Sequence, residues 1–372
     1  MTMLQHLYGY CGQSPWLDNL TRAYLRDGTL ARMVDNGIRG VTANPAIFAR
    51  SITGSHDYDE QFSELVAAGK SVDEAYWELV VSDAGQALSV LRPVFDRGDR
   101  VDGFVSVEVS PELAHDAPAT IAAARWLRRR IAQPNLLVKI PATAEGVTAV
   151  ESLTSEGNSI NVTLLFSLSR YAEIIEAYLS GLEKFTANGG DPSTVSSVAS
   201  FFISRVDTEV DHRLEALGTD EALALRGQAA VAQAKLAYRL FTEQFSTKRW
   251  HRLAALGADV QRPLWASTST KNPNDRDTRY VEELIGPDTV TTLPEATIAA
   301  FEDHGTTART VDNGVPQAAE VIRRLAAAGI DMTAVGRTLE DNGIAAFEKA
   351  YRDALADLTA STLTSGARHP GR

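Results

Sequence analysis

A lysine inside an apolar segment is the residue of this sequence that most directly suggests chemistry. Lys139 stands in the run NLLVKIP (residues 135–141), which is typical of a buried strand, and it alone among the lysines is enclosed on both sides by branched aliphatic residues. Burying an ammonium is costly unless its charge is paired or neutralised, so burial favours the neutral amine. A neutral amine is a nucleophile that can form a Schiff base with a carbonyl substrate. The alternative is a strand-end lysine whose head reaches solvent along its methylene stem.

Other polar residues lie near the ends of further strand-like segments. Glu108 stands inside VSVEV (residues 105–109), and an acid in an apolar strand is rarely buried without a partner. Asp18 is alternatively explained as a helix cap, and Asn44 before a proline as a turn residue. Taken together, these residues favour a catalytic site. The remaining candidates are Asn161, Thr163, Ser200, Arg205, Ser267 and Lys271.

These residue types suit the cleavage of a carbon–carbon bond next to an imine. Making and dehydrating a carbinolamine on Lys139 needs an acid and base, and Glu108 with Thr163 can serve through a water. The protonated imine then withdraws electrons from the bond that breaks. Asp18 is the candidate base for the hydroxyl proton released in that step, because two acids in different environments can hold different roles.

The remaining side chains point to a phosphorylated sugar as the substrate. The amides of Asn44 and Asn161 can hydrogen-bond sugar hydroxyls. Arg205, Ser267 and Lys271 can hold a phosphate at the outer mouth of the site.

A fold that brings the ends of many strands together must position these residues. Short apolar segments alternate with longer amphipathic helical patterns, which predicts a parallel sheet covered by helices. Eight strands favour an α/β fold closed as a single (β/α)8 TIM barrel with extra helices, whose active site lies at the carboxyl ends of the strands. An open doubly wound sheet is the alternative, but the sequence has no glycine-rich phosphate loop. The predicted strands are residues 15–18, 38–42, 103–109, 135–140, 159–165, 195–201, 263–267 and 289–293.

Between these strands, the helical patterns leave no long linker, so we expect one barrel domain over residues 1–358. The composition of residues 359–372 (TASTLTSGARHPGR) predicts a disordered tail. The predicted helices are residues 20–35, 59–96 (as two helices), 111–132, 146–155, 168–186, 204–217, 220–245, 277–285, 294–303, 315–328 and 333–358.

Composition argues against several classes of function. The net charge of −12, from 36 basic and 48 acidic residues, argues against a nucleic-acid surface. A single cysteine, Cys11, and seven scattered histidines offer no disulfide framework and no metal-binding spacing, so we expect neither a metal nor a cofactor. No apolar stretch approaches the ~20 residues that span a bilayer, and the N-terminus has no signal-peptide pattern. We therefore expect a cytoplasmic protein without a membrane partner, and either a monomer or a homodimer.

Six segments, in order along the chain, resemble the transaldolase family and specifically its longer bacterial type. The resemblance runs from about Trp16 to about Leu358, and several ordered motifs are far more specific than any one of them. The segments are GVTANPAIF (40–48), VSVEV (105–109), LLVKIPATAEG (136–146), NVTLLFS (161–167), SFFISR (200–205) and WAST (265–268).

The resemblance implies a class I aldolase-like barrel that transfers a dihydroxyacetone unit reversibly from sedoheptulose 7-phosphate to glyceraldehyde 3-phosphate. The products are erythrose 4-phosphate and fructose 6-phosphate, in the non-oxidative pentose phosphate pathway. It implies a Schiff base on Lys139, a catalytic water handled by Glu108 and Thr163, and Asp18 as the base in bond cleavage. It also implies that the dihydroxyacetone moiety is positioned by Asn44, Asn161 and Ser200. The phosphate is then bound by Arg205 and Ser267.

The sequence departs from the family pattern at two positions. Ala43 stands where the first signature usually has serine or threonine. Ser269 stands where many members have an arginine, and Lys271 follows it. We expect Lys271 to supply the phosphate cation, although a lysine is a point charge rather than a planar fork.

Two rival functions make different predictions. Free aldolases on the same scaffold look shorter and carry a tyrosine where this chain has Phe202, whose ring has no hydroxyl to help protonate an enamine. Length and Phe202 therefore favour a transferase. A non-catalytic sugar-phosphate-binding barrel predicts replacement of Lys139, Glu108 or Asp18, and all three are present.

Overall fold

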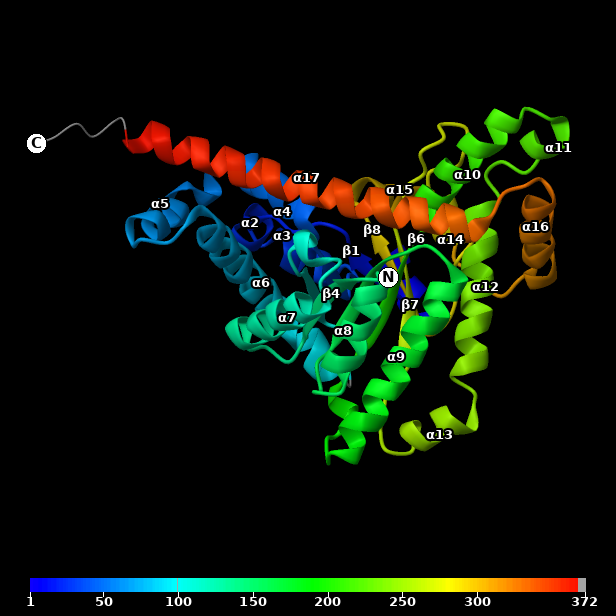
Figure 1. Cartoon of the computed structure of the whole chain (residues 1–372), viewed down its shortest axis with the longest axis horizontal. Coiled ribbons are helices and arrows are strands. Elements are labelled where there is room, and N and C mark those ends of the chain that lie inside the picture. Colours follow the sequence, from blue (N-terminus) through cyan, green and yellow to red (C-terminus); the bar gives the residue numbers. More distant parts are fainter. Residues whose placement is uncertain (99, 367–372) are drawn as a thin grey trace, which may run out of the picture.

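Eight parallel strands form a closed barrel at the centre of the computed structural model, which describes residues 1–98 and 100–366 (Figure 1). Each strand pairs with the next along the chain, and the last pairs with the first. The predicted (β/α)8 TIM barrel with extra helices is confirmed, and the open doubly wound alternative is wrong. The strands are β1 Gln13–Leu17, β2 Gly40–Thr42, β3 Phe104–Glu108, β4 Leu136–Pro141, β5 Ile160–Leu165, β6 Ser197–Phe202, β7 Gln261–Ala266 and β8 Thr289–Leu293.

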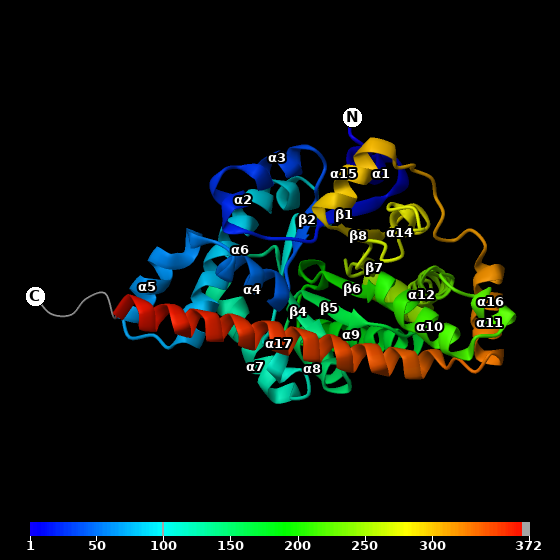
Figure 2. The ribbon, with the colours of Figure 1, turned by 90° about the horizontal axis from the view of Figure 1, so that it is seen from above.

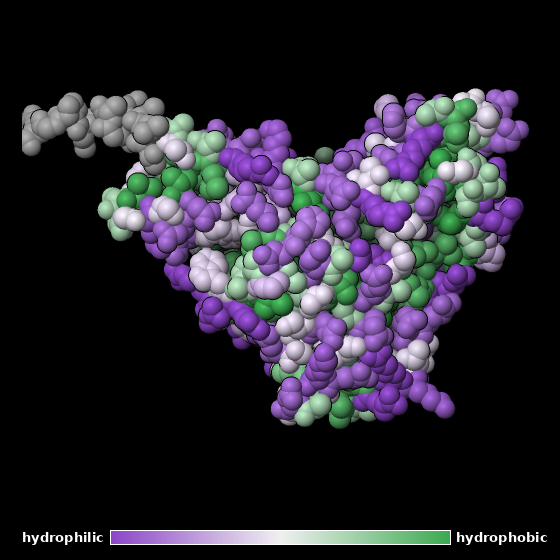
Figure 3. Space-filling model, in the orientation of Figure 1, coloured by the Kyte–Doolittle hydropathy of each residue, from purple (hydrophilic) through white to green (hydrophobic). Residues whose placement is uncertain are grey.

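The helices cover the outside of the barrel. They are α1 Met3–Cys11, α2 Arg22–Arg26, α3 Thr29–Asp35, α4 Pro45–Thr53, η1 His56–Tyr58, α5 Asp59–Ala67, α6 Val72–Arg97, η2 Pro111–Leu113, α7 Ala117–Ile131, α8 Ala144–Thr154, α9 Leu168–Ala187, η3 Pro192–Thr194, α10 Ile203–Leu217, α11 Asp220–Leu223, α12 Ala229–Gln244, α13 Lys248–Ala254, α14 Arg279–Glu282, α15 Glu295–His304, α16 Val315–Ala327 and α17 Met332–Gly366. On the face shown in Figure 3, hydrophilic residues predominate and apolar residues are interspersed among them. None of the helices in the described part of the chain is both long and apolar enough to cross a membrane.

Every residue of each strand is buried, which explains why strands such as β4 and β5 can be recognised as apolar runs rather than alternating patterns. The number and the bounds of the helices differ more from the prediction than those of the strands do. Two predicted helices are each divided in two by a glycine in the left-handed region, Gly28 at φ +76° and Gly227 at φ +68°. Helix α4 was not predicted, although Asn44 caps it and Pro45 opens it, which is a recognisable start signal.

The C-terminal helix α17 runs across the whole molecule (Figure 1), and the view from above shows it along one side of the barrel, past α10 and α4 (Figure 2). It packs on both of these helices and on β5. It continues to Gly366, beyond the boundary expected at residue 358, because no glycine or proline interrupts residues 344–365. Residues 367–372 of the expected tail lie outside the described residues.

A buried carboxylate ties the amino-terminal ends of four strands together. Asp102 is fully buried just before β3. It accepts hydrogen bonds from Ser14 Oγ at 2.8 Å and Trp16 Nε1 at 3.2 Å, both on β1. It also pairs with Arg39, next to β2, at 2.8 Å and with Arg262 of β7 at 3.2 Å. This network holds the end of the barrel that lies away from the predicted site.

We expect Asp102→Ala to lower the free energy of unfolding by about 3–5 kcal/mol, because it leaves Arg262 buried without its carboxylate. Urea unfolding followed by circular dichroism measures this. Asp96→Ala is the control, since Asp96 pairs with Arg92 on the exposed face of α6 and should contribute little. Equal stabilities for the two variants would show that the Asp102 network does not hold the barrel.

Candidate active site

A cavity of about 350 Å³ opens at the carboxyl ends of the strands, where the site was predicted. Most of the predicted residues line it: Asp18, Asn44, Lys139, Ser200, Phe202, Arg205, Ser267 and Lys271. Glu108, Asn161 and Thr163 are not on its wall but are buried in the neighbouring strands. The wall also contains residues that sequence reasoning missed, among them Thr42, Arg50, Ser269 and Phe347.

Lys139 and Glu108 form a buried ion pair beside the cavity. The strand register places them opposite one another on β4 and β3, and Lys139 Nζ lies 3.3 Å from Glu108 Oε2. The two residues are 4% and 3% exposed, so Lys139 is a buried lysine with a carboxylate partner and not a strand-end lysine on the outer surface. Burial raises the pKa of the Glu108 carboxyl, and the nearby Lys139 ammonium opposes that rise. A carboxyl held in this way is suited to exchanging a proton with the amine beside it.

Two buried oxygen atoms near this pair have no hydrogen-bond donor or acceptor among the described residues, namely Glu108 Oε1 and Thr163 Oγ1. Thr163 lies in an irregular part of β5, where Leu164 has a φ of +56° and the register with β6 shifts between Val162 and Leu165. Such irregularities re-aim side chains next to functional sites. Buried polar atoms normally have a partner, so these two are available to a water or a reacting group.

Asn161 is held in a buried chain of hydrogen bonds beneath the cavity. Ser200 Oγ donates to Asn161 Oδ1 at 2.7 Å, and Asn161 Nδ2 donates to Ser106 Oγ at 2.9 Å. These two contacts determine which way the amide faces. Sequence reasoning missed Ser106, although it stands two residues before Glu108 and therefore on the same face of β3.

Asp18 and Asn44 lie on adjacent parts of the rim. Asp18 follows β1 and accepts a hydrogen bond from Thr42 Oγ1 at 3.1 Å. It caps no helix, because Thr21 is the cap of α2. Asn44 does cap α4, with its Oδ1 3.0 Å from the amide of Ile47, and it lines the cavity as well. Its capping role therefore leaves the Nδ2 donor for another partner.

The environment of Asp18 shifts its titration. Burial raises the pKa of its carboxyl, opposed first by the Lys139 ammonium and then by the Thr42 hydrogen bond. The guanidinium groups of Arg50 and Arg205 act in the same lowering direction. Asp18 is thus a carboxylate surrounded by cations in a partly desolvated place, which is a common setting for a catalytic base.

Arg205 is confined between two aromatic rings. Its guanidinium carbon lies 4.9 Å from the ring centre of Phe202 and 5.8 Å from that of Phe347 on α17. It forms no ion pair with any described residue, and burial lowers the pKa of its guanidinium. The positive charge is thus positioned by packing and is free to meet an anion in the cavity.

The other predicted phosphate contacts lie on the loop after β7. Ser267 has a φ of +57°, an uncommon conformation for a residue with a side chain, and its Oγ lies 2.8 Å from Ser204 Oγ. Strained backbone of this kind clusters at binding sites. Lys271 is exposed and donates to Ser269 Oγ at 2.8 Å.

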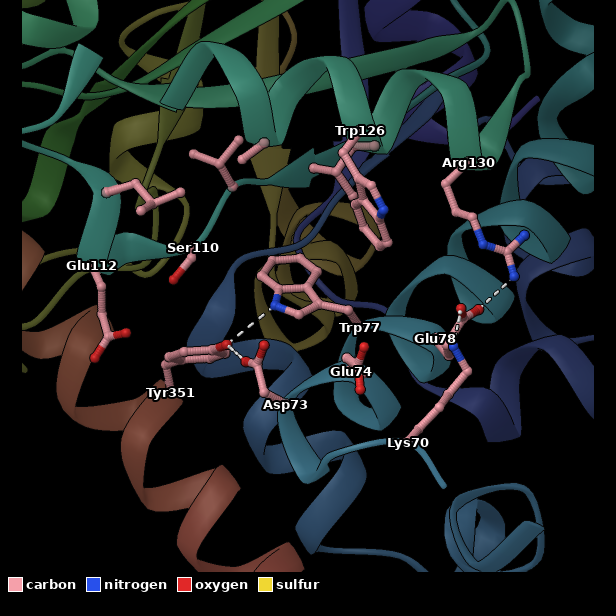
Figure 4. Close-up of a pocket in the computed structure, with 14 residues that line it drawn as sticks. Lys70, Asp73, Glu74, Trp77, Glu78, Ser110, Glu112, Trp126, Arg130 and Tyr351 are labelled. Atoms are coloured by element: carbon pink, nitrogen blue, oxygen red, sulfur yellow. Dashed lines mark hydrogen bonds and ion pairs between the residues drawn. The ribbon is translucent and has the colours of Figure 1, made fainter. Parts of the chain in front are cut away.

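A second cavity, of about 590 Å³, lies between α6, α7 and α17 (Figure 4). In Figure 4 the indole of Trp77 donates to Tyr351, which in turn donates to Asp73. None of the predicted site residues lines this cavity, and its one lysine, Lys70, is paired with Glu78 at 3.1 Å. Of these two cavities, the first is therefore the one that lies beside the buried lysine–carboxylate pair. Within residues 1–98 and 100–366 no three His, Cys, Asp or Glu side chains are grouped so as to hold a metal.

The fold and the site together define a (β/α)8 barrel with a buried lysine–carboxylate pair at the carboxyl ends of its strands. The family model described as Transaldolase/Fructose-6-phosphate aldolase matches residues 15–358. The chain therefore belongs to the transaldolase/fructose-6-phosphate aldolase family.

Curated relatives match almost end to end. A protein named Transaldolase from Acidothermus cellulolyticus is 48% identical over 363 residues, covering 97% of both chains. A Transaldolase from Mycolicibacterium smegmatis is 46% identical over 359 residues, covering 96% of both. Transaldolase 1 from Streptomyces coelicolor is 46% identical over 357 residues, covering 95% of this chain and 94% of its own. The family resemblance predicted from sequence is confirmed.

We expect Phe347→Ala to release Arg205 from its aromatic enclosure. The rate at which phenylglyoxal modifies Arg205, measured by peptide mass spectrometry, should rise about fivefold, the factor that corresponds to roughly 1 kcal/mol of lost ring contact. Arg239 on the surface is the internal reference, and Arg22, buried against Asp83, must stay protected if the variant is folded. An unchanged rate at Arg205 would mean that Phe347 does not confine it.

Proposed function

We propose that this protein is a transaldolase, which transfers a dihydroxyacetone unit reversibly from sedoheptulose 7-phosphate to glyceraldehyde 3-phosphate. The products are erythrose 4-phosphate and fructose 6-phosphate, in the non-oxidative pentose phosphate pathway. The observation that carries the proposal is the buried pair of Lys139 and Glu108, 3.3 Å apart beside a cavity that also holds Asp18. The relatives named Transaldolase support it.

The reaction begins at Lys139. When the lysine proton passes to Glu108, the amine attacks the ketose carbonyl and a carbon–nitrogen bond forms. The former carbonyl oxygen then leaves as water, with Glu108 returning the proton and Thr163 holding the water. Because burial raises the pKa of Glu108, its carboxyl holds this proton more readily than an exposed carboxyl would.

Cleavage follows at the bond between the third and fourth carbons of the ketose. Asp18 takes the proton of the hydroxyl on the fourth carbon, and the bonding electrons move onto the protonated imine. The aldehyde product leaves, and an enamine of dihydroxyacetone stays on Lys139. An incoming aldehyde reacts with this enamine by the same steps in reverse, and hydrolysis of the new imine frees the ketose product.

The remaining side chains hold the substrate. Asn44 and Ser200 line the cavity and hydrogen-bond the dihydroxyacetone unit, with Ser200 held in place by Asn161. Arg205, Ser267 and Lys271 bind the phosphate. The Asn44 amide, the Arg205 guanidinium and the Lys271 ammonium donate hydrogen bonds, which suits hydroxyl and phosphate oxygens. Ser200 donates its hydrogen to Asn161, so its oxygen accepts a hydrogen bond from a substrate hydroxyl.

A free aldolase that releases dihydroxyacetone is the second candidate, since the family name covers both activities. Phe202 favours transfer. It lines the cavity, its ring packs 5.6 Å from that of Phe166, and it offers no hydroxyl to protonate the enamine. The enamine then survives until an aldehyde acceptor arrives.

We also propose that the enzyme is cytoplasmic and acts on sugar phosphates through its own side chains, without a cofactor. It forms one barrel domain over residues 1–358 and is a monomer or a homodimer. The single cysteine, Cys11, supports a reducing compartment.

We expect borohydride treatment with fructose 6-phosphate to leave a dihydroxyacetone-sized adduct on the wild-type protein and none on Lys139→Ala, because reduction traps the imine. Intact-mass spectrometry measures this. Lys184→Ala, which removes an exposed lysine paired with Glu151 on the outside of the barrel, is the matched control and should be trapped as wild type is. If the wild-type protein is folded and stays unmodified, the transaldolase mechanism is contradicted and the non-catalytic sugar-phosphate-binding barrel is favoured instead.

We expect kcat to fall as pH decreases through the pKa of Asp18, because the base must be ionised. Burial raises that pKa above the ordinary value of 3.8, and the Thr42 hydrogen bond partly offsets the rise. Thr42→Val removes the bond and so raises the pKa of Asp18 further, which moves the acid limb of the pH–rate profile to higher pH. The Thr42 hydroxyl donates to Asp18 and forms no hydrogen bond with Glu108 in the described part of the chain, so an unmoved limb would assign the titration to another group.

A further inference from the structure

Helix α4 turns one face to the candidate active site. Ala46, Ile47 and Arg50 line the cavity. Arg50 is four residues after Ala46 and three after Ile47, so it is a neighbour of both on the helix surface. Asn44, the cap of this helix, lines it too. Arg50 Nε donates to the carbonyl of Ala46 at 3.3 Å, which folds the guanidinium back toward the start of the helix. The side chain thus belongs to the same wall as Asn44.

The charge of Arg50 has no partner. It forms no ion pair with any described residue, whereas most arginines of the chain's surface do, for example Arg92 with Asp96 at 2.7 Å. Arg205 likewise forms no ion pair with any described residue. Both guanidinium groups lower the pKa of one carboxyl, that of Asp18. Both therefore lie around the same part of the cavity.

The cavity is positive in an acidic protein. The cavity is lined by four cations, Lys139, Arg50, Arg205 and Lys271, and Asp18 is its only lining carboxylate among the described residues. The net charge of the chain, by contrast, is −12. A phosphate dianion needs more than one cation, and a guanidinium meets phosphate oxygens with two parallel donors. Arg50 is exposed at the rim, where an incoming anion arrives first.

Lys271 is the rival for this role. It is an exposed residue of the loop after β7 and is hydrogen-bonded to Ser269. It lines both the active-site cavity and a neighbouring polar cavity of about 740 Å³ near α10 and α14. It therefore lies at the boundary of two cavities, whereas Arg50 lines only the one that holds Lys139.

We propose that Arg50 is a substrate-binding residue that, together with Arg205, pairs with the phosphate of the sugar-phosphate substrates. The proposal rests on the transaldolase function and adds the second cation of its phosphate site. Arg50 is not one of the reacting groups and reaches the chemical steps only through the pKa of Asp18, which its charge lowers. At a pH above that pKa its effect is on affinity.

Kinetics with matched acceptors test the proposal. We expect Arg50→Ala to raise KM for glyceraldehyde 3-phosphate roughly tenfold, with kcat little changed, because one charged contact to the phosphate is lost. KM for D-glyceraldehyde, which has no phosphate, should stay as in wild type. The inhibition constant of inorganic phosphate should rise by a similar factor, and Arg50→Lys should fall between wild type and Arg50→Ala.

Two controls complete the experiment. Arg92→Ala removes an exposed arginine remote from the cavity and should behave as wild type, and Lys271→Ala tests the rival cation. The proposal is overturned if Lys271→Ala shows the phosphate-specific loss and Arg50→Ala does not. It is also overturned if Arg50→Ala raises KM equally for both acceptors, which would indicate a general distortion of the site. Borohydride trapping of wild type separates these results from a failure of the transaldolase function itself.

Discussion

The pair of Lys139 and Glu108 is the constraint around which the site is built. Both side chains are buried, and removing two charges from water costs several kcal/mol each unless they offset one another. Their separation of 3.3 Å is possible only because β3 and β4 are neighbours in a closed barrel, in a register that sets the two residues opposite one another. Each charge is thus tolerated because the barrel supplies the other, and the same closeness lets a proton pass between them.

Stability and chemistry are placed at opposite ends of the barrel. At the amino-terminal ends of the strands, Asp102 is surrounded by donors and its charge is fully paired. At the carboxyl ends, Arg205 and Arg50 have no ion-pair partner among the described residues, and Glu108 Oε1 and Thr163 Oγ1 have no hydrogen bond there. Buried polar atoms without a hydrogen bond also occur at the amino-terminal ends, for example Gln13 Oε1 and Gln261 Oε1. The unpaired cations that line a cavity are therefore what marks the carboxyl ends as the place where a ligand supplies the missing partners.

Parts of the fold were predictable because their causes are local. Strands such as β4 and β5 appear as apolar runs because they are buried on both faces, and this pattern extends over only a few residues. The division of the helices at Gly28 and Gly227 was missed, since a glycine within a helical pattern does not reveal by itself that it adopts a positive φ. Helix α4 was missed because its short sequence was interpreted only as a signature and a turn.

The site shows the same division between local and distant causes. Lys139, Glu108 and Asp18 could be chosen from sequence, because a polar residue at the end of an apolar strand is unusual wherever the strand lies. Their convergence followed once the number of strands implied a barrel. The structure, by contrast, shows that Asn161 is held between Ser106 and Ser200 beneath the cavity rather than on its wall.

By itself, then, the sequence determined the chemistry: a nucleophilic amine, two acids and a set of hydrogen-bond donors. The apolar composition of the strands that carry them was enough to predict that these strands are buried. Only the tertiary structure decided which other side chains complete the site. Phe347 reaches Arg205 from a helix more than a hundred residues further along the chain, and Arg50 faces the cavity because α4 packs against that same helix. Such contacts depend on the closure of the barrel and the path of α17, and no local pattern of residues encodes a distance between segments so far apart.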